Sequence, residues 1–128
     1  MNTDVHDRGA SKALTQQVIG AAFEVSNYLG SGLLEKVYEN ALVVELSQRG
    51  VPLEVQRALP VFYKGSLVGD YIADMVVAER VLVELKCVQG LREEHTAQCI
   101  NYLRASGLRL CLLLNFQRPR LEWKRIAL

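Results

Sequence analysis

The sequence contains no apolar run that approaches the roughly 20 residues needed to span a lipid bilayer. Residues 1–11 are polar and of mixed charge, without the apolar core of a secretory signal, so we expect a cytoplasmic protein. Repeats, low-complexity tracts and linkers are also missing, and 128 residues suffice for one hydrophobic core. These absences predict a single domain over residues 12–128 behind a flexible N-terminus at residues 1–11.

Cysteine is scarce, and its pattern argues against two kinds of site. The three cysteines, Cys87, Cys99 and Cys111, are odd in number, widely spaced and set in apolar stretches. This pattern fits neither a disulfide framework nor a zinc site, so we expect buried free thiols in a reducing compartment.

The chain also lacks an excess of either charge. Its formal net charge is +1, so no overall field draws it to nucleic acid, and binding must use a local patch. Basic residues cluster only near the C-terminus, at Arg118, Arg120, Lys124 and Arg125. The solvated end of a strand explains this cluster as well as a phosphate-binding surface does.

The hydrophobic pattern predicts a mixed α/β fold with element order ααβββαββ. Apolar residues at helical spacing, bounded by glycines, and runs of Val, Ile and Leu between turns set the boundaries. We expect helices at residues 12–29, 33–48 and 92–105, and strands at 53–63, 67–77, 81–88, 108–116 and 121–127. A right-handed crossover through the third helix makes the third and fourth strands parallel. The result is a mixed β-sheet flanked by helices.

Three charges interrupt the apolar hairpin formed by the second and third strands: Asp74, Glu84 and Lys86. If residues 78–80 form the turn, Asp74 lies opposite Glu84, and Glu84 and Lys86 share a face. Buried charges need partners or a metal ion. Two explanations remain open: Lys86 neutralises a carboxylate on a solvated face, or the carboxylates form a metal site.

The second and third helices add further candidates. On the second helix, the predicted buried face consists of Leu34, Val37, Tyr38, Ala41, Leu42 and Leu46. Glu35 lies at the edge of that face, where it either stabilises the helix start or points at the charged hairpin. Glu45 lies near its middle and needs a partner such as arginine. On the third helix His95, Gln98 and Tyr102 form one polar stripe.

These residues resemble a known family. Gly32 to Tyr38 reads G-x-x-E-x-x-Y, and with Asp74, the Glu84-Leu85-Lys86 segment and the closing LLLNF segment at residues 112–116 the chain closely resembles the small bacterial GxxExxY proteins. That family is placed in the PD-(D/E)xK nuclease superfamily, with a restriction-endonuclease-like core. The resemblance covers residues 14–126. Gln98 and Tyr102 are similar to the Q-x-x-x-Y motif of RecB-type nuclease domains.

The chain departs from the family pattern at two positions. Ser26 stands where a histidine is common in the first helix, and Ser31 stands where the turn often has proline.

The resemblance implies a nuclease that hydrolyses phosphodiester bonds of DNA or RNA with Mg²⁺ or Mn²⁺. Its implied metal ligands are Asp74, Glu84, the carbonyl of Leu85 and Glu35. Lys86 would orient the attacking water, completing the implied catalytic set with Glu35, Asp74 and Glu84. Tyr38, Gln98 and Tyr102 would bind or position the substrate.

Further expectations concern partners and rival roles. The partner implied is nucleic acid, and we expect a homodimer without membrane association. One alternative is a catalytically inactive nuclease-like module that binds nucleic acid or a protein. Another is a structural Asp74–Lys86 pair without metal.

Overall fold

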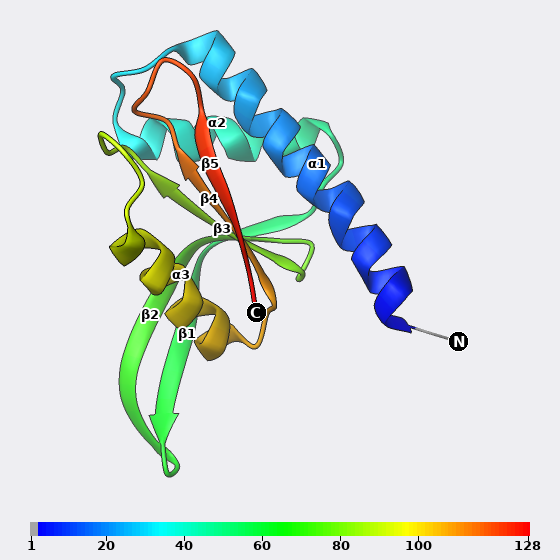
Figure 1. The fold of residues 1–128 in the computed structure, drawn as a ribbon, viewed down its shortest axis with the longest axis vertical. Coiled ribbons are helices and arrows are strands. Elements are labelled where there is room, and N and C mark those ends of the chain that lie inside the picture. Colours follow the sequence, from blue (N-terminus) through cyan, green and yellow to red (C-terminus); the bar gives the residue numbers. More distant parts are fainter. Residues whose placement is uncertain (1–2) are drawn as a thin grey trace.

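The computed structural model describes residues 3–128, with side chains from Gly9 onward. Three helices and five strands follow the predicted order ααβββαββ (Figure 1). Their bounds are α1 Thr3–Leu29, α2 Glu35–Gln48, β1 Leu53–Tyr63, β2 Ser66–Val77, β3 Val81–Lys86, α3 Glu93–Ser106, β4 Leu110–Asn115 and β5 Glu122–Ala127. Within this described part, no helix is both long and apolar enough to cross a membrane.

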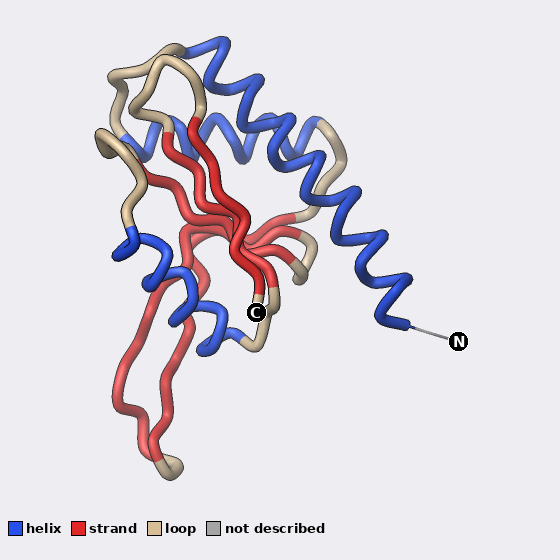
Figure 2. The backbone as a smooth tube through the Cα atoms, in the orientation of Figure 1, coloured by secondary structure: helices blue, strands red, loops and turns tan. Residues whose placement is uncertain are grey.

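The five strands form one mixed sheet in the order β1-β2-β3-β4-β5. Strands β3 and β4 are parallel, as the crossover rule predicts, and the other neighbours are antiparallel. Helices α1 and α2 lie on one face of the sheet and α3 on the other (Figures 1 and 2). The third helix is the crossover between the two parallel strands.

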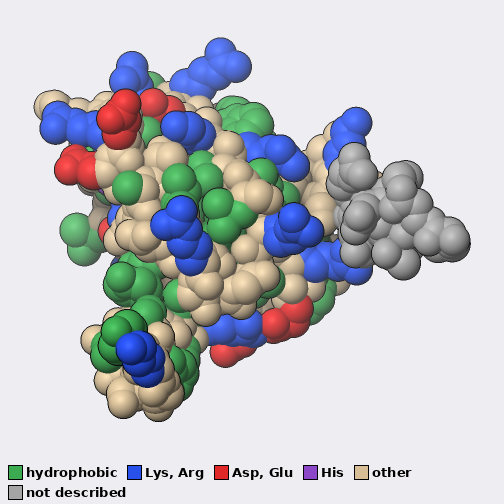
Figure 3. Space-filling model, turned by 60° about the horizontal axis from the view of Figure 1, so that its bottom comes forward, with side chains coloured by type: hydrophobic (Ala, Val, Ile, Leu, Met, Phe, Trp, Pro, Cys, Tyr) green, Lys and Arg blue, Asp and Glu red, His purple; other side chains and the backbone are tan. Residues whose placement is uncertain are grey.

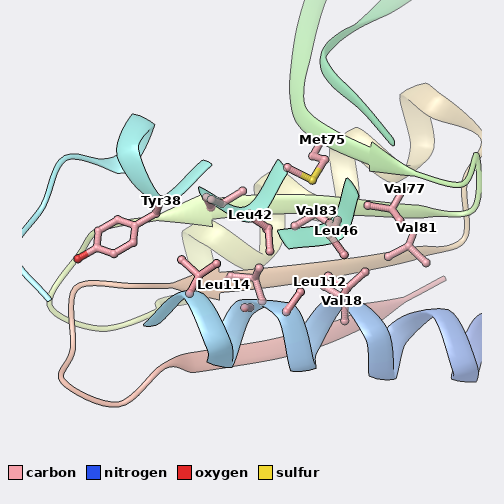
Figure 4. Close-up of a cluster of buried hydrophobic side chains, with 14 of the residues drawn as sticks. Val18, Tyr38, Leu42, Leu46, Met75, Val77, Val81, Val83, Leu112 and Leu114 are labelled. Carbon is pink, nitrogen blue, oxygen red and sulfur yellow. The ribbon is translucent and has the colours of Figure 1, made fainter. Parts of the chain in front are cut away.

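The hydrophobic core consists of two clusters, one on each face of the sheet. Side chains of α1 and α2, including Val18, Leu42 and Leu46, pack on one face of the central strands (Figure 4). On the opposite face, Cys99 and Leu103 of α3 pack against the sheet. Every residue of β4 is buried, as expected for a continuous apolar strand covered on both sides. Cys87, Cys99 and Cys111 are free thiols, and Cys87 is only partly buried.

The first helix begins earlier than the sequence pattern predicts. It starts at Thr3 rather than near residue 12, so residues 3–11 of the predicted flexible terminus are helical. No proline interrupts this stretch, because the first proline of the chain is Pro52. Met1 and Asn2, also assigned to that terminus, lie outside the described residues.

The predicted buried face of α2 is partly wrong. Leu34 is 78% exposed because it is the extended N-cap residue before the helix starts, and Val37 is 40% exposed. Glu39 takes an inner position instead, and its side chain is buried with Tyr38 and Leu42. The inner face of α2 therefore carries a carboxylate that hydrophobic periodicity does not predict.

Tyr38 fixes the connection between the first two helices. Its side chain is fully buried and stacks on Phe116 with ring centroids 4.8 Å apart. Its hydroxyl donates to the carbonyl of Gly30 at 2.5 Å and accepts the N–H of Leu33 at 3.2 Å. The chain leading into Glu35 is thereby tied to the core.

At the other end of α2, Glu45 has the arginine partner that the sequence predicts. Arg49 Nε lies 2.9 Å from Glu45 Oε2, and Arg49 Nη1 donates to Gln17 of α1 at 3.1 Å. The side chain of Glu45 is 25% exposed, so this pair is partly buried. The contact fastens α2 to α1.

Strands β1 and β2 project beyond the rest of the sheet as a two-stranded ribbon (Figure 2). They span 11 and 12 residues, whereas β3 spans 6. Hydrophobic side chains gather on the projecting end (Figure 3), where Phe62, Tyr63, Leu67 and Val68 are all more than half exposed.

Replacing Tyr38 with Phe tests the connection between the helices. Tyr38→Phe keeps the stack on Phe116 but removes both hydrogen bonds of the hydroxyl, so we expect the free energy of unfolding in urea to fall by about 1–2 kcal/mol. Tyr28→Phe, at a tyrosine that is 86% exposed, is the matched control. Equal unfolding midpoints for the two variants would contradict a stabilising role for the hydrogen bonds of the Tyr38 hydroxyl.

Candidate active site

The candidate site lies where β2 and β3 part. The ladder between them runs from Val77↔Val81 to Met75↔Val83 and stops there. Beyond it, the N–H of Asp74 donates to Glu84 Oε2 at 2.7 Å, and the N–H of Leu85 donates to Asp74 Oδ2 at 2.9 Å. The two carboxylates thus bridge the strands in place of backbone carbonyls, and the predicted proximity of Asp74 and Glu84 is observed.

Asp74 is unpaired on its other side as well. The pairing of β1 with β2 passes from Val55↔Met75 to Arg57↔Ala73, so among the described residues Asp74 has no register partner on β1. The intervening residue, Gln56, has a φ of 52°. This left-handed backbone conformation is uncommon for a residue with a side chain. The sheet is therefore irregular around Asp74 on both sides.

Burial makes this carboxylate pair electrostatically unfavourable. Glu84 is only 3% exposed, and its pKa is raised to about 8, first by burial and then by the charge of Asp74. Burial also raises the pKa of Asp74, an effect that the N–H of Leu85 opposes and Glu39 reinforces. A buried and a half-buried carboxyl this close together cannot both ionise readily without a compensating cation.

Lys86 is held by the third helix rather than by a carboxylate. Its Nζ donates to Gln98 Oε1 at 2.7 Å, and Gln98 Nε2 donates to the hydroxyl of Tyr102 at 3.2 Å. In the described part of the chain, no ion pair within 4 Å joins Lys86 to Asp74. Lys86 nevertheless lowers the pKa of both Asp74 and Glu84, so its charge acts on the site from nearby. This arrangement does not fit the structural Asp74–Lys86 pair that the sequence left open.

Helix α2 brings two more carboxylates to the site. Glu35 is its first residue; burial and the charge of Asp74 raise its pKa, and Lys86 lowers it. Glu39, one turn later, raises the pKa of both Glu35 and Asp74. Glu35 therefore lies within electrostatic reach of Asp74 and Lys86, as the resemblance implies.

Glu39 is the residue that the sequence reasoning missed. It is 4% exposed, accepts Gln56 Nε2 at 2.7 Å and pairs with Lys36. The available signal was its position directly after the G-x-x-E-x-x-Y motif and one turn beyond Glu35. A charged residue in that position on an otherwise apolar helix face indicates a polar neighbour.

The remaining predicted residues fall into two groups. Tyr38 is fully buried and bonded to the α1–α2 connection, which suits positioning of that segment rather than contact with a ligand. Gln98 and Tyr102 line the site through their link to Lys86. His95, from the same predicted stripe, instead accepts the N–H of Arg92 at 2.9 Å and caps the start of α3.

Asn115 fixes the loop that follows Lys86. It is fully buried; its Oδ1 accepts the N–H of Val88 at 3.1 Å, and its Nδ2 donates to the carbonyl of Val88 at 2.9 Å. Arg118, from the turn after β4, donates to the carbonyl of Gln89 at 3.3 Å. The exposed basic turn before β5 is thus connected to the loop beyond Lys86.

The donor chemistry of the site fits a hard divalent cation. No group of three or more His, Cys, Asp or Glu side chains is preassembled around a metal position within the described residues. Mg²⁺ needs few protein ligands, however, because it prefers carboxylate oxygens and retains several waters. Among the described residues, four carboxyls, Glu35, Glu39, Asp74 and Glu84, interact here with two ammonium groups, Lys36 and Lys86. A divalent cation would offset the excess negative charge.

The raised pKa of Glu84 predicts how pH affects the metal-free protein. The folded state holds this proton up to about pH 8, whereas an ordinary glutamate releases it near 4.5, so stability falls as pH rises through that interval. Glu84→Gln should remove this loss and leave the protein more stable than wild type at pH 9, by up to a few kcal/mol.

The measurement is urea unfolding in EDTA at pH 5, 7 and 9. Glu24→Gln, on the exposed side of α1, is the control and should follow wild type. A Glu84→Gln variant with the same pH dependence as wild type would rule out this electrostatic description.

Comparison with a solved structure agrees with this fold. The crystal structure of SSO0001 superposes with a TM-score of 0.57 at 18% identity, covering 72% of this chain and 48% of that one. At this identity the likeness concerns the fold alone, and this chain spans about half the length of that protein. An alkaline exonuclease, LHK-Exo from Laribacter hongkongensis, aligns with a TM-score of 0.48 and 13% identity over 83% of this chain and 75% of the other.

No curated protein sequence matches the chain. A model of the PD-(D/E)XK nuclease superfamily matches residues 12–126 and so includes all four charged positions Glu35, Asp74, Glu84 and Lys86. Nearly the whole chain is covered by this match, and we conclude that the protein belongs to the PD-(D/E)XK nuclease superfamily.

Proposed function

We propose that the protein is a metal-dependent nuclease that hydrolyses phosphodiester bonds of DNA or RNA. The observation that carries the proposal is the close pair formed by the half-buried Asp74 and the buried Glu84, set between parting strands within reach of Lys86. Without a cation this arrangement raises the pKa of both acids, so folding stability alone does not account for it.

Asp74, Glu84 and the carbonyl of Leu85 would hold Mg²⁺ or Mn²⁺. Such a cation, when bound, neutralises charge that develops on the phosphate and makes water a better nucleophile. Leu85 is fixed through its own N–H, which donates to Asp74. Glu35, exposed at the start of α2, would hold a water of the coordination shell or accept its proton.

Lys86 would orient the attacking water and stabilise the negative charge of the transition state. Gln98 occupies one of its three donor directions, which leaves others to point at a phosphate oxygen. Gln98 is itself bonded to Tyr102, so α3 sets the direction of the ammonium group. We therefore assign Lys86 to catalysis and both α3 residues to positioning.

The basic turn between β4 and β5 would hold neighbouring phosphates. Arg118 and Arg120 are exposed there, and Lys124 of β5 donates to Thr96 of α3 at 3.0 Å. With an overall charge of only +1, this local group would supply most of the attraction for a polyanion.

Asp74→Ala tests the proposal most directly. We expect wild type to bind Mg²⁺ or Mn²⁺ in a calorimetric titration and to cut labelled DNA or RNA, and we expect the variant to lose both properties. Asp70→Ala, at an exposed position on the same strand, should keep both. If wild type cuts no nucleic acid in either metal and Asp74→Ala behaves identically, the protein acts instead as an inactive nuclease-like binding module.

Lys86 and Gln98 are expected to separate catalysis from metal binding. Lys86→Ala removes stabilisation of the transition state, so kcat should fall by roughly 10²–10³-fold while metal affinity remains. Gln98→Ala leaves the ammonium present but less well oriented, so its loss should be smaller. Gln48→Ala, exposed at the end of α2, is the control. A Gln98→Ala defect as large as that of Lys86→Ala would contradict the positioning role.

A further inference from the structure

A hollow of about 310 Å³ lies beside the candidate site, between α3 and β2. Its lining consists of Tyr71, Glu94, Ala97, Gln98, Asn101 and Tyr102. The α3 members recur at spacings of three and four residues and therefore share one face of the helix. Ala97 provides the space, because any larger side chain at this exposed helical position would extend into the hollow.

The walls of the hollow combine an aromatic surface with polar edges. The rings of Tyr71 and Tyr102 contact each other with centroids 5.2 Å apart and an interplanar angle of 35°. Tyr71 remains 38% exposed, so part of its side chain is available for stacking. Glu94, Gln98 and Asn101 supply hydrogen-bonding groups around it. A flat heteroaromatic ring with donors and acceptors on its edge matches this surface.

The charge of the lining excludes the phosphate itself. Among the described residues, neither Lys nor Arg lines the hollow, and Glu94 contributes a carboxylate. A phosphate would be repelled there, whereas a neutral base could donate its ring N–H (N3–H in thymine) or an exocyclic amine to Glu94 or Asn101. The volume also lies at the lower end of the range for small-ligand sites, which suits one base.

Gln98 connects the hollow to the catalytic residues. Its Oε1 accepts Lys86 Nζ, while its Nε2 donates to Tyr102 in the wall of the hollow. One amide group thus separates Lys86 from the aromatic surface. A nucleotide whose base occupied the hollow would have its own phosphate on the side of Lys86.

We infer that this hollow is a base pocket that binds one unstacked nucleobase of a single-stranded nucleic acid, next to the phosphodiester bond to be cut. The inference rests on the proposed nuclease function and specifies its substrate. Bases within a duplex are stacked and paired, so occupying the pocket favours single strands, where stacking on protein aromatics supplies the binding energy.

The test measures binding without chemistry. In an Asp74→Asn background with EDTA, fluorescence anisotropy would follow a short labelled oligothymidylate, its abasic counterpart and a duplex of equal length. The oligothymidylate should bind more tightly than both. Tyr71→Leu should weaken its binding by roughly five- to a hundredfold. Tyr71→Phe should retain it because the ring remains.

Two further variants test whether an effect of Tyr71→Leu is specific to the hollow. Ala97→Leu fills the pocket at an exposed helical position that accepts leucine, and it should weaken oligothymidylate binding as Tyr71→Leu does. Tyr63→Leu, at a tyrosine 62% exposed on the same ribbon but outside the pocket, should bind like the parent. Thermal unfolding of each variant establishes that it is folded.

The outcomes separate the base pocket from the nuclease activity. Equal affinity for intact and abasic strands, or no effect of Tyr71→Leu and Ala97→Leu, overturns the base pocket. Absence of any binding by the Asp74→Asn protein overturns it too. Metal-dependent cutting by wild type that is lost in Asp74→Ala would uphold the nuclease in either case, because it does not depend on these affinities.

Discussion

The parting of β2 and β3 is the constraint on which the rest of the site depends. A regular antiparallel ladder would pair Asp74 and Glu84 through their backbone groups, with both side chains on the same face of the sheet. Here each carboxylate accepts an N–H from the other strand, which anchors its position through the backbone. The anchoring helps to keep these two carboxyl groups close together although burial raises the pKa of both. The candidate catalytic groups therefore lie around the gap where β2 and β3 separate.

The hairpin that frames this opening was predictable because local rules determine it. The turn at residues 78–80 and the alternation of side chains place Asp74 opposite Glu84 without knowledge of the rest of the fold. The parallel arrangement of β3 and β4 also follows from a general rule of crossover handedness. The irregularity that leaves Asp74 unpaired depends on the positive φ of Gln56, which no sequence pattern announces.

The contribution of α2 was less predictable because helical periodicity does not reveal how far a neighbouring sheet extends. Leu34 and Val37 satisfy the apolar pattern but reach solvent, while Glu39 breaks it and is buried. The polar environment of Glu39 is created by Gln56, seventeen residues away in sequence, and by Asp74. The residues of the polar stripe on α3 also have different roles. His95 caps the start of the helix, whereas Gln98 accepts a hydrogen bond from Lys86.

The projecting ribbon has a consequence for how such a protein can change. Within the described residues, no hydrogen bond or charge from the ribbon beyond Leu59 and Tyr71 acts on Asp74 or Glu84, and β1 and β2 pair with each other there. Insertions or deletions near its tip therefore leave the register at Asp74 intact. Because side chains alternate between the faces of a ribbon, matched changes of two residues in each strand would also preserve which surface is apolar. The length of the ribbon can therefore vary without moving the residues of the candidate site.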